Sequence, residues 1–434
     1  MRLRFRCLLL EAGAGRLDPV RDVLVAAGAL VGQAPIAAVL GAPPDDATVI
    51  LADARDAAAV DLLRRVVTPD WLPSRALVAL AAAGDTATIS RAVASGADDV
   101  VCLPLDEREL LERLDFAATL ARARAELHAR EAVYAGFRGG PAPAADPVSG
   151  RGGVAADARV LMVGKPGVLQ TQLVAALRGA ALAYADDESL PAALTLKAPF
   201  DLLVRTGVAP WPEFDPDAVP QPPVVLVLPK DAPDRPAGGA PVQPLAILRT
   251  PLTADLAKLR LEAALRLARL RQRLRRPPAD EGEAFAHDAL TGLASQGFLL
   301  AYGERLASTS GGRAHVVIGL APADFHHWTD VYGHPTAGRA LAAVGREVRR
   351  VIRAEDFAAH VGDGRLVLIV AADPDGAAAL RHRLAAVAGR AAARVLGREP
   401  GFETSVEPLR PGQPAARVFE RALLNLRGVR FLVS

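Results

Sequence analysis

The chain has 434 residues, a net charge of +2 at pH 7 and a hydrophobic fraction of 51%. This length suggests about three domains with buried cores, and the balanced charge argues against a broad nucleic-acid-binding face. No run reaches the roughly 18 apolar residues of a membrane span, and the two cysteines, Cys7 and Cys102, lie in apolar runs. We therefore expect a cytoplasmic protein with no transmembrane segment, no disulfide and no nucleic-acid partner.

The first 132 residues alternate short apolar runs with helical patterns, an order typical of a doubly wound parallel α/β sheet. The expected strands are Arg4–Leu10, Thr48–Leu51, Ala76–Leu80 and Asp99–Cys102. The expected helices are Thr86–Ala94 and a long helix from Glu107 to about Ala132. We therefore predict a first α/β domain over residues 1–132 that ends in a long helix.

The end of this first domain carries a distinctive run of residues. Ser95-Gly96-Ala97-Asp98-Asp99, with Leu103-Pro104-Leu105-Asp106 after it, resembles the end of response-regulator receiver domains, which are flavodoxin-like. In that family a strand-terminal Asp accepts phosphate, with help from an acidic pair, a hydroxyl residue and a lysine. The resemblance implies that Asp53, which closes an apolar run, occupies the phosphoacceptor position.

The other receiver positions depart from that pattern. The acidic pair is reduced to Glu11 beside Ala12, the hydroxyl position is Ala81 and the lysine position is Leu103. A phosphate on Asp53 would therefore lack its usual partners. Two interpretations stay open: Asp53 is a leftover strand-end carboxylate, or it is a vestigial phosphoacceptor that, together with Glu11, holds a metal or accepts phosphate inefficiently. In both cases we expect no strong phosphorylation switch.

Residues 133–157 are rich in Gly, Pro and Ala and are predicted to form a flexible linker. Residues 158–276 then repeat the receiver pattern in a weaker form. The expected strands are Arg159–Val163, Asp201–Val204, Val224–Leu228 and Leu245–Leu248, and a long amphipathic helix follows over Thr253–Arg276. Pro277-Pro278 should break this helix.

The second receiver-like domain has lost the phosphorylation residues altogether. Gly164-Lys165 replaces the acidic pair and Thr206 replaces the phosphoacceptor, while Pro229 and Thr250 occupy the hydroxyl and lysine positions. Aspartyl phosphorylation by the receiver mechanism is therefore excluded here. We expect this domain to provide dimer contacts or a partner-binding surface.

Three motifs follow in residues 277–434. They are Asp288-Ala289-Leu290-Thr291-Gly292-Leu293, then Phe325 to His334, and then Arg353-Ala354-Glu355-Asp356 with Gly362-Asp363-Gly364-Arg365-Leu366 after a gap of five residues. Their order and spacing resemble the GGDEF family, the bacterial diguanylate cyclase domains that join two GTP molecules into cyclic di-GMP. The resemblance implies a nucleotidyl-cyclase-like α/β fold, with Arg353 and Asp356 as the family's RxxD motif and a degenerate signature after it.

The family's catalytic positions are occupied by other residue types. The two metal-ligand positions are Ala321 and Gly364, and Arg365 follows where a further acidic residue is usual. Thr329 and Gly338 replace the residues that contact guanine. Nucleotidyl transfer of this kind uses carboxylate-bound Mg²⁺ to neutralise phosphate charge. We therefore expect a chain that is not an enzyme and that holds neither a metal nor a cofactor.

The nucleotide-binding half of the pattern is retained. A guanidinium can engage guanine O6 and N7 or bridge to a phosphate, which fits Arg353, and a carboxylate can accept from the guanine N1–H and N2–H₂ edge, which fits Asp356. Family members add a second arginine from the next helix, and Arg383 fits that position better than Arg381. We therefore predict cyclic di-GMP binding, as a single nucleotide or an intercalated dimer. The alternative for Arg353 and Asp356 is a surface ion pair.

The order of two receiver-like domains and a GGDEF-like domain is similar to the PleD-type layout. With its degenerate signature, the chain resembles the PopA-like response regulators. That resemblance implies a homodimeric cyclic di-GMP effector at the cell pole, which directs a cell-cycle regulator to proteolysis through an RcdA-like adaptor and the ClpXP protease pathway. Two alternatives remain: a nucleotide-independent scaffold, and a residual diguanylate cyclase.

Overall fold

The computed structural model forms two compact units, each of which is described by itself. The first unit contains Met1–Ala125 and Ala145–Gln272, and the second contains Glu126–Ala144 and Arg273–Ser434. The described residues are 5–11, 15–36, 47–55, 60, 74–138, 156–195, 200–211, 222–233, 243–275, 285–308, 315–372 and 374–426. Among these residues, no helix combines the length and apolar character that a membrane span requires.

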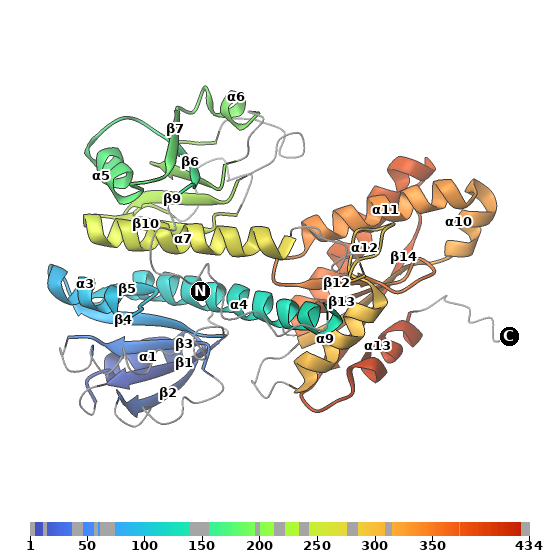
Figure 1. Cartoon of the computed structure of the whole chain (residues 1–434), viewed down its shortest axis with the longest axis horizontal. Coiled ribbons are helices and arrows are strands. Elements are labelled where there is room, and N and C mark those ends of the chain that lie inside the picture. Colours follow the sequence, from blue (N-terminus) through green and yellow to red (C-terminus); the bar gives the residue numbers. More distant parts are fainter. Residues whose placement is uncertain are drawn as a thin grey trace. The chain divides into compact units, whose positions relative to one another are not determined.

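The first sheet of the first unit has five parallel strands in the order β2-β1-β3-β4-β5 (Figure 1). The strands are β1 (Arg6–Glu11), β2 (Leu30–Pro35), β3 (Val49–Asp53), β4 (Ala76–Ala82) and β5 (Asp99–Leu103). Its helices include α1 (Asp18–Ala26) and α3 (Thr86–Ala94). Every residue of β3 is buried, as expected for a central parallel strand covered on both faces. The strand order is the flavodoxin-like one.

The second sheet repeats this topology with its own strands. Its order is β10-β9-β8-β6-β7, so the second strand along the chain again lies at the edge beside the first. The elements are β6 (Arg159–Val163), α5 (Val168–Ala176), β7 (Ala181–Ala185), α6 (Leu190–Leu194), β8 (Leu202–Thr206), β9 (Val224–Pro229) and β10 (Ala246–Thr250). The predicted parallel α/β architecture is therefore confirmed.

Two long helices follow the two sheets, α4 (Glu107–Arg138) and α7 (Ala254–Arg275). Helix α4 continues to Arg138 rather than ending near Ala132, so residues 133–138, which we expected to begin the linker, are helical. Residues 139–155 of the expected linker, and Pro277-Pro278, lie outside the described residues. The division between the units falls within α4, because Ala125 belongs to the first unit and Glu126 to the second.

Buried ion pairs hold both helices against the end of the first sheet. Arg124 of α4 lies 2.8 Å from the Asp98 carboxylate, which also accepts a hydrogen bond of 3.0 Å from the backbone N–H of Leu77. Arg260 of α7 donates to Glu109 at 2.6 Å and lies 3.5 Å from Asp99. Asp98 and Asp99 therefore form buried ion pairs with the two helices. Loss of either carboxylate would leave a buried arginine without its compensating charge.

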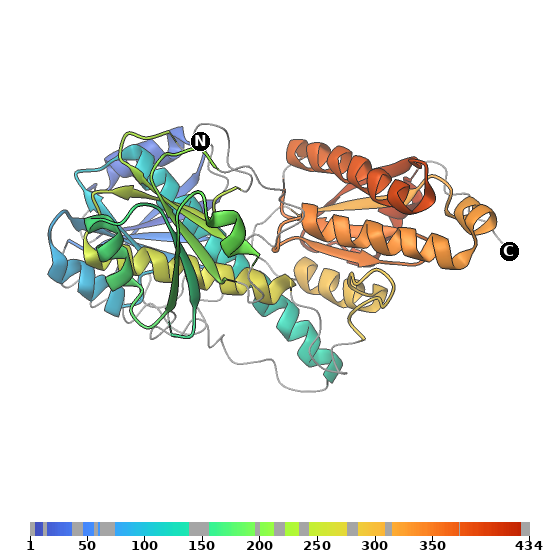
Figure 2. The same ribbon diagram turned by 90° about the horizontal axis from the view of Figure 1, so that it is seen from above.

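The second unit is built on an antiparallel sheet of order β12-β13-β11-β14. Its strands are β11 (His315–Pro322), β12 (Phe357–His360), β13 (Leu366–Val370) and β14 (Phe402–Leu409), and its helices are α9 (Gln296–Ser308), α10 (Phe325–Tyr332), α11 (His334–Val351), α12 (Pro374–Leu396) and α13 (Ala415–Leu424). Helices α11 and α12 run side by side (Figure 2) and share one core with the sheet, whereas α9 and α13 pack in a second core.

The motif that contains Asp288 and Thr291 docks onto helix α11. Asp288 Oδ1 accepts hydrogen bonds from the backbone N–H of Thr291 at 2.8 Å and from its hydroxyl at 2.6 Å. The loop approaches Gly345 so closely that a Cβ there would lie 2.7 Å from the Thr291 carbonyl oxygen. His360 Nδ1 of β12 lies 3.2 Å from Asp288. The motif thus joins α11 to β12, the two elements on either side of the Arg353–Asp356 turn.

Candidate functional site

The turn formed by residues 353–356 joins the end of α11 to the start of β12. Its backbone is closed by two interactions: Asp356 Oδ2 accepts from the N–H of Arg353 at 3.0 Å, and the N–H of Asp356 donates to the Arg353 carbonyl at 3.2 Å. Asp356 is only 8% exposed, whereas the Arg353 residue is exposed. Burial raises the pKa of Asp356, against the lowering effects of the Arg353 N–H and guanidinium charge. The turn therefore presents its cation outward and its carboxyl group inward.

The second predicted arginine lies close to the same turn. Arg383, on α12, donates from Nη2 to the Val351 carbonyl oxygen at 3.1 Å, two residues before Arg353 in the chain. Arg383 is exposed, and the runner-up Arg381 is half-buried. Arg383 thus contacts the C-terminal end of α11, and Arg353 follows that end by two residues. Such a pair can engage an anion that carries more than one negative charge.

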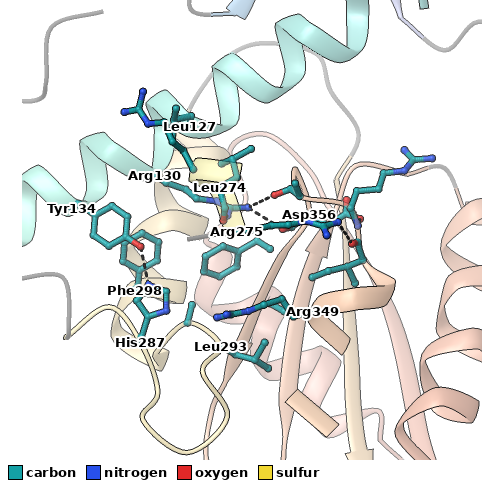
Figure 3. A pocket seen from close by; sticks show the side chains of 17 residues that line it. Leu127, Arg130, Tyr134, Leu274, Arg275, His287, Leu293, Phe298, Arg349 and Asp356 are labelled. Carbon is teal, nitrogen blue, oxygen red and sulfur yellow. Dashed lines mark hydrogen bonds between the residues drawn. The ribbon is translucent and has the colours of Figure 1, made fainter. Parts of the chain in front are cut away.

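The inner side of the turn is held by a residue that the motif did not predict. Arg130 of α4 donates from Nη2 to the backbone carbonyls of Ala354 and Asp356, at 3.3 Å and 2.9 Å (Figure 3). A pocket beside the turn, lined by Arg130, Arg349, Arg353 and Asp356 among others, has a volume of ≈ 90 Å³. Ligand pockets usually have about 300–1,000 Å³. This pocket is therefore too small to enclose a dinucleotide.

The positions that family resemblance assigns to metal ligands do not fit a divalent cation. Ala321 is 1% exposed and carries a methyl group. Gly364 has no side chain and a φ of +72°, and a Cβ there would lie 2.8 Å from the Phe325 ring. Arg365 lies beside it and pairs with Asp363 at 2.8 Å. Hard cations such as Mg²⁺ require oxygen ligands, and Ala321 and Gly364 supply no side-chain oxygen.

The remaining acidic residues near these positions serve local structure. Asp324 caps helix α10, because its Oδ1 accepts from the backbone N–H of His327 at 2.9 Å. The Asp363 side chain is 68% exposed and has a φ of +50°, in the left-handed region. Asp324 thus serves as a helix cap, and Asp363 is an exposed turn residue that pairs with Arg365. Thr329 donates its hydroxyl to the His326 carbonyl oxygen at 2.8 Å, within its own helix.

In the first unit, Asp53 is already paired with an internal cation. Its carboxylate is fully buried and accepts two hydrogen bonds from the Arg55 guanidinium, each of 2.7 Å. Arg16 lies 3.6 Å away. Burial raises the pKa of Asp53, but the hydrogen bonds and charge of Arg55 outweigh burial and hold that pKa below its ordinary value. The Arg55 guanidinium thus contacts both oxygens of Asp53, the residue that the receiver resemblance assigns as phosphoacceptor.

The other residues that the receiver resemblance singles out also make contacts within their own sheets. Glu11 accepts hydrogen bonds from the backbone N–H of Leu17 at 3.3 Å and from Gln33 Nε2 at 2.8 Å. In the second sheet, Thr206 lies so close to Gly164 that a Cβ at Gly164 would meet its hydroxyl at 2.1 Å. At each position that the receiver resemblance assigns to phosphorylation, neighbouring side chains of the same sheet make the contacts.

Sequence reasoning missed Arg130 and Arg55. The signal for Arg55 was present, since it follows the strand-end Asp53 by two positions. Arg130 gave no local signal, because its contact with Ala354 joins residues 224 positions apart. The structure places Arg353, Asp356 and Arg383 in one region of the second unit, and it places Asp53 in the first unit.

Comparisons with known proteins bear on the second unit. Residues 285–406 match the family model described as "Diguanylate cyclase, GGDEF domain". Curated proteins give no match. Similar solved structures include the diguanylate cyclase SiaD in complex with its activator SiaC from Pseudomonas aeruginosa, at 23% identity and a TM-score of 0.30, over 38% of this chain and 66% of that one. The chain thus spans slightly less than two thirds of that protein.

Two further similar structures are single GGDEF domains. One is the GGDEF domain of DgcB from Caulobacter crescentus in complex with c-di-GMP, at 21% identity and a TM-score of 0.28, over 32% of this chain and 84% of that one. The other is the FimX GGDEF domain from Pseudomonas aeruginosa, at 17% identity and a TM-score of 0.28, over 32% of this chain and 90% of that one.

The family match corrects one expectation. We expected a chain that is not an enzyme, but the matched family is described as diguanylate cyclases, which are an enzyme class. The expectation rested on Ala321 and Gly364, which supply no side-chain oxygen for a metal, and substitutions at such positions do not remove a domain from its family. Residues 285–406 are a GGDEF domain, and this domain indicates a role in cyclic di-GMP signalling.

Proposed function

We propose that the chain binds cyclic di-GMP on the exposed side of the Arg353–Asp356 turn. One observation carries the proposal: Arg383 of α12 donates to the Val351 carbonyl oxygen, two residues before the exposed Arg353, within residues that match the GGDEF domain family. Cyclic di-GMP has two phosphates and two guanines. A guanidinium fork can pair with either group in a bidentate manner.

The three residues take different roles in this proposal. Arg353 engages the O6 and N7 edge of one guanine or an adjacent phosphate, which typically contributes about 1–3 kcal/mol of discrimination. Arg383 supplies a second cation and matters more if an intercalated nucleotide dimer binds. Asp356 uses Oδ2 to close the turn. We propose that its Oδ1 accepts from the guanine N1–H and N2–H₂ edge, which requires the guanine to reach the inward-facing carboxyl group.

The first unit would connect this receptor to protein partners. The flavodoxin-like order of both sheets supports the receiver assignment, and the filled sites around Asp53 and Gly164 support use as binding surfaces rather than phosphorylation switches. By the PopA-like resemblance, we propose a homodimer at the cell pole that directs a cell-cycle regulator to proteolysis through an RcdA-like adaptor and the ClpXP pathway.

A nucleotide-independent scaffold is the second candidate, and one observation favours it. Asp356 is buried and closes its own turn, which is what a purely structural Arg-x-x-Asp turn would do. In that case Arg353 would be an exposed side chain with no ligand. The two candidates therefore differ in whether the guanidinium of Arg353 meets a nucleotide.

Calorimetric titration of the full chain with cyclic di-GMP tests the proposal. The parent chain should bind, and Arg353→Ala should lose about tenfold or more in affinity with an unchanged melting temperature, because the side chain is exposed. Arg339→Ala is the matched control, since Arg339 is an exposed arginine of α11 that donates to Thr336 within the same helix. Equal affinities for Arg353→Ala and the parent would favour the scaffold.

A further inference from the structure

Helix α4 reaches the nucleotide-binding turn through one buried guanidinium. Arg130 donates from Nη1 to the Leu274 carbonyl at 3.1 Å, and from Nη2 to the Ala354 and Asp356 carbonyls at 3.3 Å and 2.9 Å. Its Nε donates to Glu126 Oε1 at 2.6 Å. A single side chain of α4 therefore joins the end of α7 to both halves of the turn (Figure 3).

The charge of Arg130 is compensated inside the second unit. Burial lowers its pKa, but the charge and hydrogen bond of Glu126 outweigh this effect, so the pKa is raised overall. The other oxygen of Glu126 accepts from the Tyr302 hydroxyl at 2.5 Å. The guanidinium carbon also lies 5.5 Å from the centre of the Phe357 ring, the first residue of β12. Arg130 is thus fixed by its own partners and can act as a rigid anchor.

This anchor acts on the backbone that carries the proposed ligand residues. The turn's own bonds join Arg353 to Asp356, and Arg130 binds the carbonyls of Ala354 and Asp356. Without Arg130, the carbonyls of Ala354 and Asp356 would lose a charged donor, and the turn could rotate. A small shift of Arg353 would weaken nucleotide binding, because a bidentate guanidinium contact depends on its geometry.

We infer that Arg130 is a positioning residue for the Arg353–Asp356 turn and that it couples cyclic di-GMP binding to helix α4. The inference rests on the proposed function, since it concerns the same turn. Helix α4 begins at Glu107 in the first unit and ends at Arg138 in the second. Coupling is reciprocal: if the anchored helix favours nucleotide binding, bound nucleotide stabilises the anchored helix by the same factor.

Three full-length variants test this inference by calorimetry. Arg130→Met removes the guanidinium and should weaken cyclic di-GMP binding about tenfold, the effect of losing charge-assisted bonds to the turn. Arg130→Lys keeps the charge opposite Glu126 and can donate to some of the same carbonyls, so it should recover part of the affinity. Arg339→Met, the matched control, should bind like the parent.

Amide hydrogen exchange provides a readout that does not depend on the ligand. Without nucleotide, the amides of Arg353 and Asp356 should exchange faster in Arg130→Met than in the parent. With cyclic di-GMP, residues 126–138 should gain protection in the parent and not in the variant. A variant with parent-like affinity and parent-like exchange at the turn would overturn the inference, whatever its melting temperature.

The two proposals fail in different ways. A parent chain that binds no cyclic di-GMP overturns the proposed function and, with it, the coupling to α4. Amide hydrogen exchange at the Arg353–Asp356 turn in the nucleotide-free protein then tests, independently of nucleotide binding, whether Arg130 positions the turn. If Arg130→Met is too unstable to measure, the same comparison is made between Arg130→Lys and Arg339→Met, and equal exchange at the turn would again overturn the inference.

Discussion

Removal of the Arg55 guanidinium should destabilise the first sheet, because the buried Asp53 carboxylate would lose its main counter-charge. The Asp53 side chain is 0% exposed, and both of its oxygens accept from Arg55 at 2.7 Å. In Arg55→Met the apolar stem remains but the guanidinium is lost. The carboxylate then keeps the backbone N–H of residue 55, at 3.2 Å, and Arg16, at 3.6 Å. The pKa of Asp53 should therefore be higher in the variant than in the parent chain.

The size of the effect follows from how exposed the two partners are. Breaking a fully buried ion pair costs about 3–5 kcal/mol, and an exposed pair contributes about 0–1 kcal/mol. The Arg55 side chain is 28% exposed while Asp53 is fully buried. We therefore expect Arg55→Met to lose about 1–3 kcal/mol of unfolding free energy at neutral pH, a value between those two limits.

The pH dependence has a definite sign. In the parent chain the pKa of folded Asp53 lies below its ordinary value, so the pair's contribution is present above the unfolded pKa of about 3.9. It is lost as the pH falls through the lower folded pKa. The stability difference between parent and Arg55→Met should therefore be largest at neutral pH and should shrink below about pH 4.

Urea unfolding followed by amide exchange in β3 is the suitable assay, because a chain of two units need not unfold in one transition. The control is the same substitution in an Asp53→Asn background. There the buried charge is absent, so Arg55→Met should cost much less. Equal losses in both backgrounds would refute the reasoning, since the cost could not then come from the Asp53 carboxylate.

Three further predictions concern separate parts of the chain. Asp53→Asn should leave cyclic di-GMP affinity within about twofold of the parent by calorimetry, because it lies in the other unit. Arg383→Ala should weaken binding less than Arg353→Ala if one nucleotide binds, and at least as much if the titration shows two nucleotides per chain. Gly345→Ala should lower the stability of the second unit by about 1–3 kcal/mol in melting curves, because its Cβ would lie 2.7 Å from the Thr291 carbonyl oxygen.

The buried strands could be predicted from the sequence with errors of one or two residues at their ends. Strand β6 (Arg159–Val163) and helix α3 (Thr86–Ala94) were predicted with their observed bounds. The edge strands β2 (Leu30–Pro35) and β7 (Ala181–Ala185) were not predicted. Most residues of both strands are exposed or half-buried, and their sequences contain Gly and Gln or several Ala. They therefore lack the continuous run of large apolar residues that marks a central parallel strand.

The binding turn could be predicted only in part. Motif spacing indicated Arg353 and Asp356, and the structure has Arg353 exposed, as expected for a surface turn. The burial of Asp356 was not predicted, because a carboxylate three residues after an N–H can either face a ligand or bond its own backbone. Arg130 could not be predicted in a chain with 51 lysines and arginines, since its contacts depend on how α4 packs.

Hydrogen exchange of the full chain with and without cyclic di-GMP reports both whether the nucleotide binds and where it binds. We expect protection at residues 351–357 and around Arg383, together with residues 126–138 of α4. Residues 49–53 of the first sheet should not change. Binding that protects other parts of the GGDEF domain and leaves the Arg353–Asp356 turn unchanged would contradict the account, as would a complete absence of protection at saturating nucleotide.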